Sequence, residues 1–215
     1  SIVCALMIGR KGSLGFPGKN IFPVLGRPLA AYPLLAAKES DHIGRIFVST
    51  DCPKIMKIAK DHDTELIDRP AELASKEALG EDAFVHGYRE IKSRLKKEGL
   101  DIELVVLLFA NGATLNKDLI DKGIAVLRKD ESFDSAVTTS VYNMWSPLRA
   151  RKLDADGCLQ PMVPFETFGD PRTLNCDRDS QGNVHFADMA VSVVRPACLE
   201  NLAEGLLPQK WICHS

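Results

Sequence analysis

The feature that most constrains the fold is an unbroken apolar run at residues 2–8 that opens directly into a glycine-rich loop. The run, IVCALMI, shows no alternation of polar and apolar side chains, which is typical of a strand buried on both faces in a parallel sheet. In open α/β sheets, ligands bind beside the loops that follow the carboxyl ends of such strands. The sequence therefore predicts an α/β fold with a binding site near residues 9–20.

The loop at residues 9–20 has the composition of a phosphate-binding turn. Its glycines, at positions 9, 12, 15 and 18, let backbone N–H groups approach an anion closely, and Arg10, Lys11 and Lys19 add positive charge. The spacing is neither the GKS or GKT ending of a P-loop nor the GxGxxG of a dinucleotide fold. On composition alone, phosphate binding and a solvated basic turn both stay open.

The same loop resembles the signature of the CMP-sugar synthetases, the cytidylyltransferases that activate N-acylneuraminate and, more distantly, 3-deoxy-manno-octulosonate. That family opens with a strand followed by AR-x-GSK-x-x-P-x-KN, and the corresponding residues here are Gly9, Arg10, Gly12, Ser13, Leu14, Pro17, Lys19 and Asn20. The resemblance implies a Rossmann-like, mostly parallel sheet flanked by helices, of the nucleotide-diphospho-sugar transferase type. It assigns nucleotide binding to Gly9, Arg10, Gly12, Ser13, Lys19 and Asn20, with Arg10 and Lys19 also catalytic.

Composition agrees with a single enzyme-sized domain over residues 1–215. The chain is 45% hydrophobic and 26% charged, and its formal net charge of -2 at pH 7 gives no sign of a nucleic-acid or acidic-membrane partner. No apolar run approaches the ~18 residues that span a bilayer, and the first residues lack a signal-peptide arrangement, so we expect a cytoplasmic protein. The cysteines form no CxxC pair, which argues against a zinc site and favours free thiols.

Residues 45–50 predict a further strand, which ends in the polar residues Ser49, Thr50 and Asp51. Thr50 and Asp51 shortly before Pro53 have the pattern of a helix N-cap with proline in the first turn. In the resembled family an STD triplet stands at this place. Capping is the favoured interpretation, and ligand contact is the alternative.

Arg69 precedes Pro70, and a residue in that position is held extended rather than helical. Such an arginine is more often a surface residue, but the resemblance places Arg69 against the cytosine base.

Residues 80–98 then predict a core helix, because apolar side chains recur at helical spacing. The family usually has a serine where Gly80 stands, so the resemblance places Gly80 beside the nucleotide with one base contact fewer.

Residues 102–109 form the other all-apolar run, and it too opens into a loop of small residues, at 110–114. Two buried parallel strands that end at the same edge of a sheet would form the two walls of one cleft. The family has LQPTSPLR here, and the match is poor, with Phe109 in place of the glutamine. We expect this loop to contribute backbone amides.

From Met144 onward the pattern changes. Short apolar stretches at Pro147–Leu153 and Cys158–Met162 flank an Asp-Ala-Asp-Gly turn, which predicts a β-hairpin. In the resembled family this excursion, here residues 144–183, reaches a second subunit and helps to close its active site. The resemblance therefore implies a homodimer, and a mobile surface loop is the alternative.

The resemblance also assigns the acceptor side of the site. Arg178 aligns with the arginine of the family's RQD motif, and a guanidinium suits bidentate binding of an acceptor's carboxylate. Asp188 stands where the family has asparagine, a change that either alters the acceptor or supplies a metal-facing carboxylate. The family's DID carboxylates, which help to hold a divalent metal, would fall just beyond residue 215, so Asp188 is the one candidate metal ligand.

Together these features predict a nucleotidyltransferase. A hydroxyl of a small acidic sugar similar to N-acylneuraminate would attack the α-phosphorus of CTP and release pyrophosphate, with Mg²⁺ carrying charge of the triphosphate. Arg10 and Lys19 would neutralise the departing phosphates. Because the departures from the family cluster at base- and sugar-facing positions, three alternatives stay open: a different acceptor such as a phosphonate, another base, and a nucleotide-binding module without catalysis.

Overall fold

The computed structural model describes residues 1–12, 15–75, 77–175, 177, 182–200 and 211–214. The chain divides into two compact units, one made of Ser1–Thr138 and Met189–Ser215, and the other of Thr139–Asp188. We call the first the sheet unit and the second the insertion unit. The insertion unit contains the excursion expected at residues 144–183, and its part in dimerisation stays a prediction.

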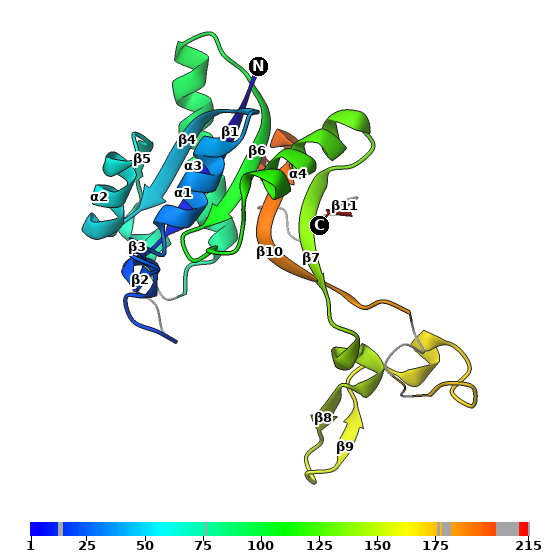
Figure 1. The fold of residues 1–215 in the computed structure, drawn as a ribbon. Helices are drawn as coiled ribbons and strands as arrows, with labels where there is room; N and C mark the ends of the chain where they lie inside the picture. Colours follow the sequence, from blue (N-terminus) through cyan, green and yellow to red (C-terminus); the bar gives the residue numbers. More distant parts are fainter. Residues whose placement is uncertain (13–14, 76, 176, 178–181, 201–210, 215) are drawn as a thin grey trace. The chain divides into compact units, whose positions relative to one another are not determined.

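The sheet unit is built on a seven-stranded sheet with the strand order β11-β7-β10-β6-β1-β4-β5 (Figure 1). β1 pairs in parallel with both β4 and β6, β4 pairs in parallel with β5, and β7 pairs in parallel with β11. β10 runs antiparallel to β6. The predicted mostly parallel sheet flanked by helices is confirmed. The strands are β1 (Ile2–Gly9), β4 (Ile43–Thr50), β5 (Glu65–Asp68), β6 (Ile102–Phe109), β7 (Ser135–Val141), β10 (His185–Val194) and β11 (Trp211–His214).

The helices begin and end close to the signals in the sequence. Pro33 lies in the first turn of α1, where a helix tolerates proline because the N–H groups have no intrahelical partner. Asn116 caps α4, because its Oδ1 accepts the backbone N–H of Leu119 at 3.0 Å. The helices are α1 (Ala31–Glu39), α2 (Pro53–Asp61), α3 (Gly80–Lys97), α4 (Lys117–Lys129) and α5 (Pro196–Glu200).

Side chains of β1 alternate between two apolar cores. The odd-numbered ones from Val3 to Met7 belong to a core with residues of α1, α2 and α4. The even-numbered ones from Cys4 to Ile8 belong to a second core with residues of α3 and α5. Because successive side chains of a strand point to opposite faces of its sheet, both faces of β1 are covered. This explains the apolar run without alternation.

Burial within these cores also affects Cys4, where it raises the pKa of the thiol to about 12. The cysteines that the structure describes are all free, as expected.

Short elements connect the strands near the carboxyl edge of the sheet. The glycine loop leads into a 3₁₀ turn, η1 (Lys19–Ile21), and a small hairpin of β2 (Pro23–Val24) and β3 (Arg27–Pro28). Another 3₁₀ turn, η2 (Ala71–Ala74), lies between β5 and α3. None of the helices in the described part of the chain is both long and apolar enough to cross a bilayer.

The insertion unit contains the predicted hairpin, formed by β8 (Arg151–Leu153) and β9 (Leu159–Pro161). Asp154 shapes its turn by accepting the N–H groups of Asp156 and Cys158, and Gly157 takes a positive φ of 78°. The strand expected to begin at Pro147 starts later, because Ser146 accepts the N–H of Leu148 and Pro147–Arg149 forms a 3₁₀ turn, η4. The other 3₁₀ turns here are η3 (Asn143–Trp145) and η5 (Phe165–Phe168).

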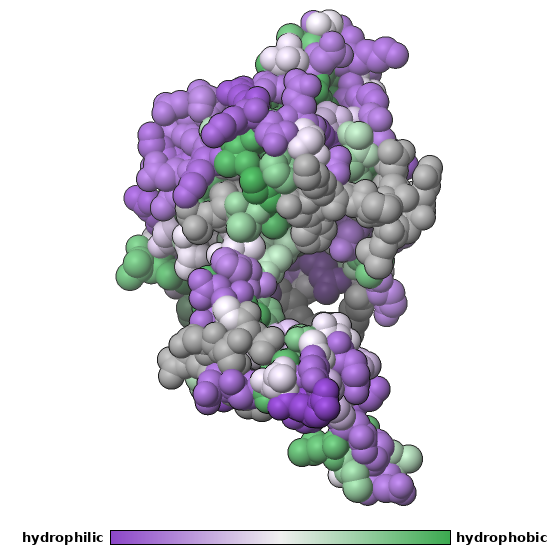
Figure 2. All heavy atoms as spheres, turned by 90° about the vertical axis from the view of Figure 1, so that its right-hand side faces the viewer, coloured by the Kyte–Doolittle hydropathy of each residue, from purple (hydrophilic) through white to green (hydrophobic). Residues whose placement is uncertain are grey.

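Large apolar side chains are exposed on the insertion unit. On the hairpin, Leu153 and Leu159 are each 68% exposed, and Figure 2 shows hydrophobic surface at the hairpin, at the bottom of the view. An aromatic cluster is formed by Tyr142, Trp145 and Phe186, in which the rings of Tyr142 and Trp145 stack at 5.5 Å. Exposed apolar groups gathered in this way are typical of interaction surfaces.

The two-core arrangement predicts a large cost for Leu6→Ala. Leu6 is 0% exposed, so we expect the substitution to lower the free energy of unfolding by about 2–5 kcal/mol in urea denaturation. Leu25→Ala is the control, because Leu25 is 93% exposed between β2 and β3, and its effect should stay within about 0.5 kcal/mol. Equal effects of the two substitutions would contradict the assignment of Leu6 to a packed core.

Candidate active site

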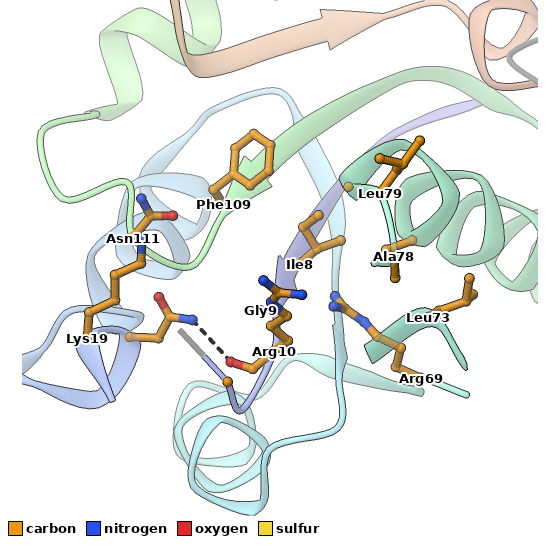
Figure 3. A pocket seen from close by; sticks show the side chains of 14 residues that line it. Ile8, Gly9, Arg10, Lys19, Arg69, Leu73, Ala78, Leu79, Phe109 and Asn111 are labelled. Carbon is orange, nitrogen blue, oxygen red and sulfur yellow. Dashed lines mark hydrogen bonds between the residues drawn. The ribbon is translucent and has the colours of Figure 1, made fainter. Parts of the chain in front are cut away.

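A cavity of about 280 Å³ lies at the carboxyl edge of the sheet unit, where β1 and β6 end (Figure 3). Its walls come from the glycine loop and η1, from the segment between β5 and α3, from the start of α3 and from the end of β6. The lining residues are Ile8, Gly9, Arg10, Gly12, Lys19, Asn20, Arg69, Leu73, Ala78, Leu79, Gly80, Ala83, Phe109 and Asn111.

The fold brings together residues that the sequence assigned to nucleotide binding. Of those candidates, Ser13 lies outside the described residues, and the others all line the cavity. Their ligand contacts stay predictions, but their common location is a property of the structure. These residues are Gly9, Arg10, Gly12, Lys19, Asn20, Arg69 and Gly80.

Arg10 links the two sides of the cavity. Its Nη1 donates a hydrogen bond of 2.5 Å to the backbone oxygen of Ser75, 65 residues further along the chain. The hydroxyl of Ser75 in turn accepts the N–H of Ala78 at 3.1 Å, which orders the turn before α3. The guanidinium of Arg10 is therefore held in place between the glycine loop and the segment that leads into α3.

Arg69 is an almost buried cation, with 8% of its surface exposed. Its Nη2 donates to the backbone oxygen of Ser49 at 2.7 Å and its Nε to the Ser49 hydroxyl at 3.4 Å. Burial lowers the pKa of Arg69, and the nearby charge of Arg10 lowers it further, whereas Asp51 raises it. Arginine nevertheless stays protonated at neutral pH. Arg69 is thus a fixed positive charge at the cavity.

The two arginines and Lys19 approach the cavity from different sides. In Figure 3 the guanidinium groups of Arg10 and Arg69 point into the same part of the cavity, and Lys19 extends toward Asn111 on the opposite side. None of the described residues that line the cavity carries a carboxylate. Three cations without an acid among them form a site that suits a polyanion.

Asn20 contributes an unsatisfied polar atom to the same cavity. Its side-chain nitrogen donates a hydrogen bond of 3.4 Å to the backbone oxygen of Arg10. Its Oδ1 is buried and has no hydrogen-bond partner among the described residues. A buried acceptor without a donor costs about 1–3 kcal/mol, so this oxygen favours a ligand that brings a hydroxyl or amino group to it.

The glycines of the loop serve different purposes. A Cβ on Gly9 would lie 2.7 Å from the Cβ of Ala110 and 3.0 Å from Cδ1 of Ile55, so packing requires glycine at this position. Gly18 takes a positive φ of 75°, which favours glycine for conformational reasons. A Cβ on Gly12 would meet no atom of the described residues within 4 Å, so packing against them does not require glycine there.

The capping role expected for Thr50 and Asp51 is wrong. Strand β4 continues through Thr50, so helix α2 begins later than expected and its N-cap residue is Cys52. The side chain of Cys52 makes no capping hydrogen bond. The Thr50 hydroxyl accepts the N–H of Cys52 at 3.0 Å, within this turn. Asp51 accepts the backbone N–H of Lys11 at 2.9 Å.

The apolar wall of the cavity includes residues that the sequence did not suggest. Leu73, Ala78 and Leu79 belong to the irregular segment between β5 and α3, which carries no periodic signal. Phe109 packs edge-on against Phe84, with ring centroids 5.3 Å apart. The loop after β6 contributes Asn111 to the lining, and whether it offers backbone amides to a ligand stays a prediction.

Gly80 is the first residue of α3. A Cβ at this position would lie 3.8 Å from atoms of Ile8 and Phe109, which is ordinary contact, so a serine would fit there.

The acceptor candidates stay untested predictions. Arg178 lies outside the described residues. Asp188 belongs to the insertion unit, where its Oδ2 accepts the hydroxyl of Ser140 at 2.7 Å. Among the described residues, no group of three His, Cys, Asp or Glu side chains could hold a metal ion. The lining of the cavity therefore does not fit a metal held by protein carboxylates.

The contrast between two loop glycines gives a testable prediction. Because a Cβ on Gly9 would overlap Ala110, we expect Gly9→Ala to lower the free energy of unfolding by about 1–3 kcal/mol. Gly12→Ala, in the same loop, should change it by no more than about 0.5 kcal/mol. Urea denaturation of both variants measures the difference, and a similar cost for both would show that Gly9 is not required by packing.

Comparison with known proteins identifies the family. A family model described as cytidylyltransferase matches residues 4–192. A similar protein is the pseudaminic acid cytidylyltransferase and UDP-2,4-diacetamido-2,4,6-trideoxy-beta-L-altropyranose hydrolase of Helicobacter pylori, 24% identical over 151 residues. Another is the N-acylneuraminate cytidylyltransferase of Escherichia coli, 31% identical over 84 residues. These matches cover 70% and 39% of this chain but only 28% and 20% of the two relatives.

Solved structures share the fold at low sequence identity. The CMP-2-keto-3-deoxy-manno-octonic acid synthetase complexed with CTP has a TM-score of 0.68 and 14% identity, covering 97% of this chain and 80% of that one. The 4-diphosphocytidyl-2C-methyl-D-erythritol synthase of Anaerococcus prevotii has a TM-score of 0.60 and 16% identity, covering 100% of this chain and 89% of that one. The family match, the cavity and the fold agree, and the chain belongs to the cytidylyltransferase family.

Proposed function

We propose that this chain is a CTP-dependent nucleotidyltransferase that joins CMP to a small acidic sugar similar to N-acylneuraminate. The observation that carries the proposal is the convergence of Arg10 and Lys19, from the glycine loop and η1, and Arg69, from the segment after β5, on one cavity whose described lining has no carboxylate. The family match and the names of the relatives support cytidine as the base and an acidic sugar as the acceptor.

The proposed reaction is an in-line displacement. The acceptor hydroxyl attacks the α-phosphorus of CTP, the bond to the β-phosphate oxygen breaks, and pyrophosphate departs. Such a reaction needs the reacting atoms held in line and the charge on the departing phosphates neutralised. Arg10 and Lys19 are suited to neutralise this charge, because both line the cavity and lie on the glycine loop and η1.

Arg69 is suited to the base. Its bonds to Ser49 use Nε and Nη2, which leaves Nη1 without a hydrogen-bond partner among the described residues. Cytosine presents acceptors on its pairing edge, and a guanidinium offers donors alone. Gly80 would then lie beside the base at the start of α3, with space for the side chain that the resembled family has there.

Three further features of the function belong to the same proposal. We expect Mg²⁺ to arrive as the complex with CTP, held by phosphate oxygens and water, since the described lining offers no carboxylate. The exposed aromatic cluster of the insertion unit supports a homodimer. The cytoplasm is the proposed location, where nucleoside triphosphates are present.

The acceptor and the base are tested together by pyrophosphate release. Turnover with CTP and an acidic sugar, but not with UTP, ATP or GTP, would support the proposal. Turnover with another nucleotide would reassign the base, and turnover with a phosphonate would reassign the acceptor. Binding of CTP without release for any acceptor would favour a nucleotide-binding module without catalysis.

Lys19→Ala should lower kcat by a hundredfold or more, on the order of 3 kcal/mol, because a charge that neutralises the leaving group is lost. Lys57→Ala is the control, since Lys57 lies on α2, where its side chain is 75% exposed and pairs with Asp61. A steady-state assay of pyrophosphate release with saturating CTP compares the two. Near-normal turnover of the Lys19 variant would remove Lys19 from the catalytic group.

The homodimer gives a separate prediction. Trp145 is 69% exposed in the aromatic cluster, so we expect Trp145→Glu to weaken self-association in sedimentation velocity. Leu25→Glu, which changes an exposed apolar residue of the sheet unit, should leave self-association unchanged. A wild-type chain that sediments as a monomer at all concentrations would contradict the homodimer.

A further inference from the structure

The end of β4 makes a long-range contact with the glycine loop. Oδ1 of Asp51 accepts the backbone N–H of Lys11 at 2.9 Å, across 40 residues of chain. Lys11 lies between Arg10 and Gly12, which both line the cavity, but Asp51 itself is not part of the lining. The carboxylate of Asp51 thus reaches the cavity in two ways, through the loop that it fastens and through the effect of its charge on Arg69.

The end of β4 also holds Arg69, which lines another wall of the cavity. Ser49 accepts two hydrogen bonds from Arg69, one at its backbone oxygen and one at its hydroxyl. Gly9 pairs with Thr50 in the register of β1 and β4, so the two strands end side by side. Asp51 thus holds the glycine loop and Ser49 holds Arg69, and because the two residues are only two positions apart they fix the position of the loop relative to Arg69.

A purely electrostatic role for Asp51 would have the opposite effect on ligand binding. A carboxylate near the site repels a polyphosphate, so its removal by itself should tighten the binding of CTP. A role in positioning the loop predicts weaker binding when the hydrogen bond is lost, despite the loss of repulsion. The sign of the change in affinity distinguishes the two roles.

We propose that Asp51 is a positioning residue, which holds the glycine loop through the N–H of Lys11 in the geometry that binds the nucleotide's phosphates. The inference rests on the proposed function, because it takes CTP to be the ligand of the cavity. It assigns a role to the end of β4 that is neither helix capping nor ligand contact.

Two substitutions of Asp51 separate the hydrogen bond from the charge. Asp51→Asn keeps an oxygen that can accept the N–H of Lys11 and removes the charge, whereas Asp51→Ala removes both. Asp61→Ala is the matched control, since Asp61 is an exposed carboxylate at the far end of α2 that pairs with Lys57. Titration calorimetry with CTP and Mg²⁺ gives the dissociation constants.

We expect Asp51→Ala to weaken CTP binding by about tenfold, the effect of one lost hydrogen bond to a charged group. Asp51→Asn should bind CTP at least as tightly as the wild type, and Asp61→Ala should bind it like the wild type. Unchanged or tighter binding by Asp51→Ala would overturn the proposal. Equal weakening by the Ala and Asn variants would also overturn it, because the charge rather than the hydrogen bond would then matter.

The backbone amide of Lys11 gives a readout that does not depend on the ligand. In the free protein, its proton signal should move upfield in Asp51→Ala and stay close to its wild-type position in Asp51→Asn. An unchanged signal in Asp51→Ala would overturn the anchoring role whatever the function. If the wild type does not bind CTP, the proposed function fails, while the Lys11 signal still tests the contact with Asp51.

Discussion

Parallel pairing of β1 with β4 and β6 is the constraint on which the site depends. Ile8 is paired with Phe109 and Gly9 with Thr50, so three strands end at nearly the same level. The loops that follow these strands are therefore neighbours, although the sequence separates them by tens of residues. The long-range polar contacts around the cavity, from Arg10 to Ser75 and from Asp51 to Lys11, depend on this register.

The cavity is lined by positively charged side chains, and none of its described lining residues carries a negative charge. Arg10 and Arg69 are both fixed by backbone oxygens, of Ser75 and Ser49 respectively, rather than by carboxylates. Backbone carbonyls satisfy the donors of a guanidinium without cancelling its charge. The positive potential thus remains available to a ligand, and a site prepared in advance loses less free energy to ordering when the ligand binds.

Patterns local in the sequence predicted the scaffold well. The apolar run at residues 102–109 and the hairpin around Asp154 are visible in the sequence because each depends on neighbouring residues. The glycine loop also indicated the edge of the sheet where the cavity lies. β11 was not expected, since four residues, Trp211–His214, give too short a pattern to identify.

Contacts between distant segments could not be predicted in this way. Thr50 and Asp51 have the composition of a helix cap, and only the length of β4 shows that Cys52 takes that position. Gly9 lines the cavity, but packing also requires glycine there because of the proximity of Ala110, which no local pattern reveals. Likewise, Leu79 lines the cavity and Ser75 accepts a hydrogen bond from Arg10, 65 residues away in the chain.

The space beside Gly80 has a consequence for how such a chain can diverge. Since a Cβ there would meet only ordinary contacts with Ile8 and Phe109, packing at the start of α3 accepts a small side chain such as serine as well as glycine. Because Gly80 also lines the cavity, such an exchange would add atoms to the cavity wall without displacing Ile8 or Phe109. The shape of the cavity can thus change at this position without a compensating change in its neighbours.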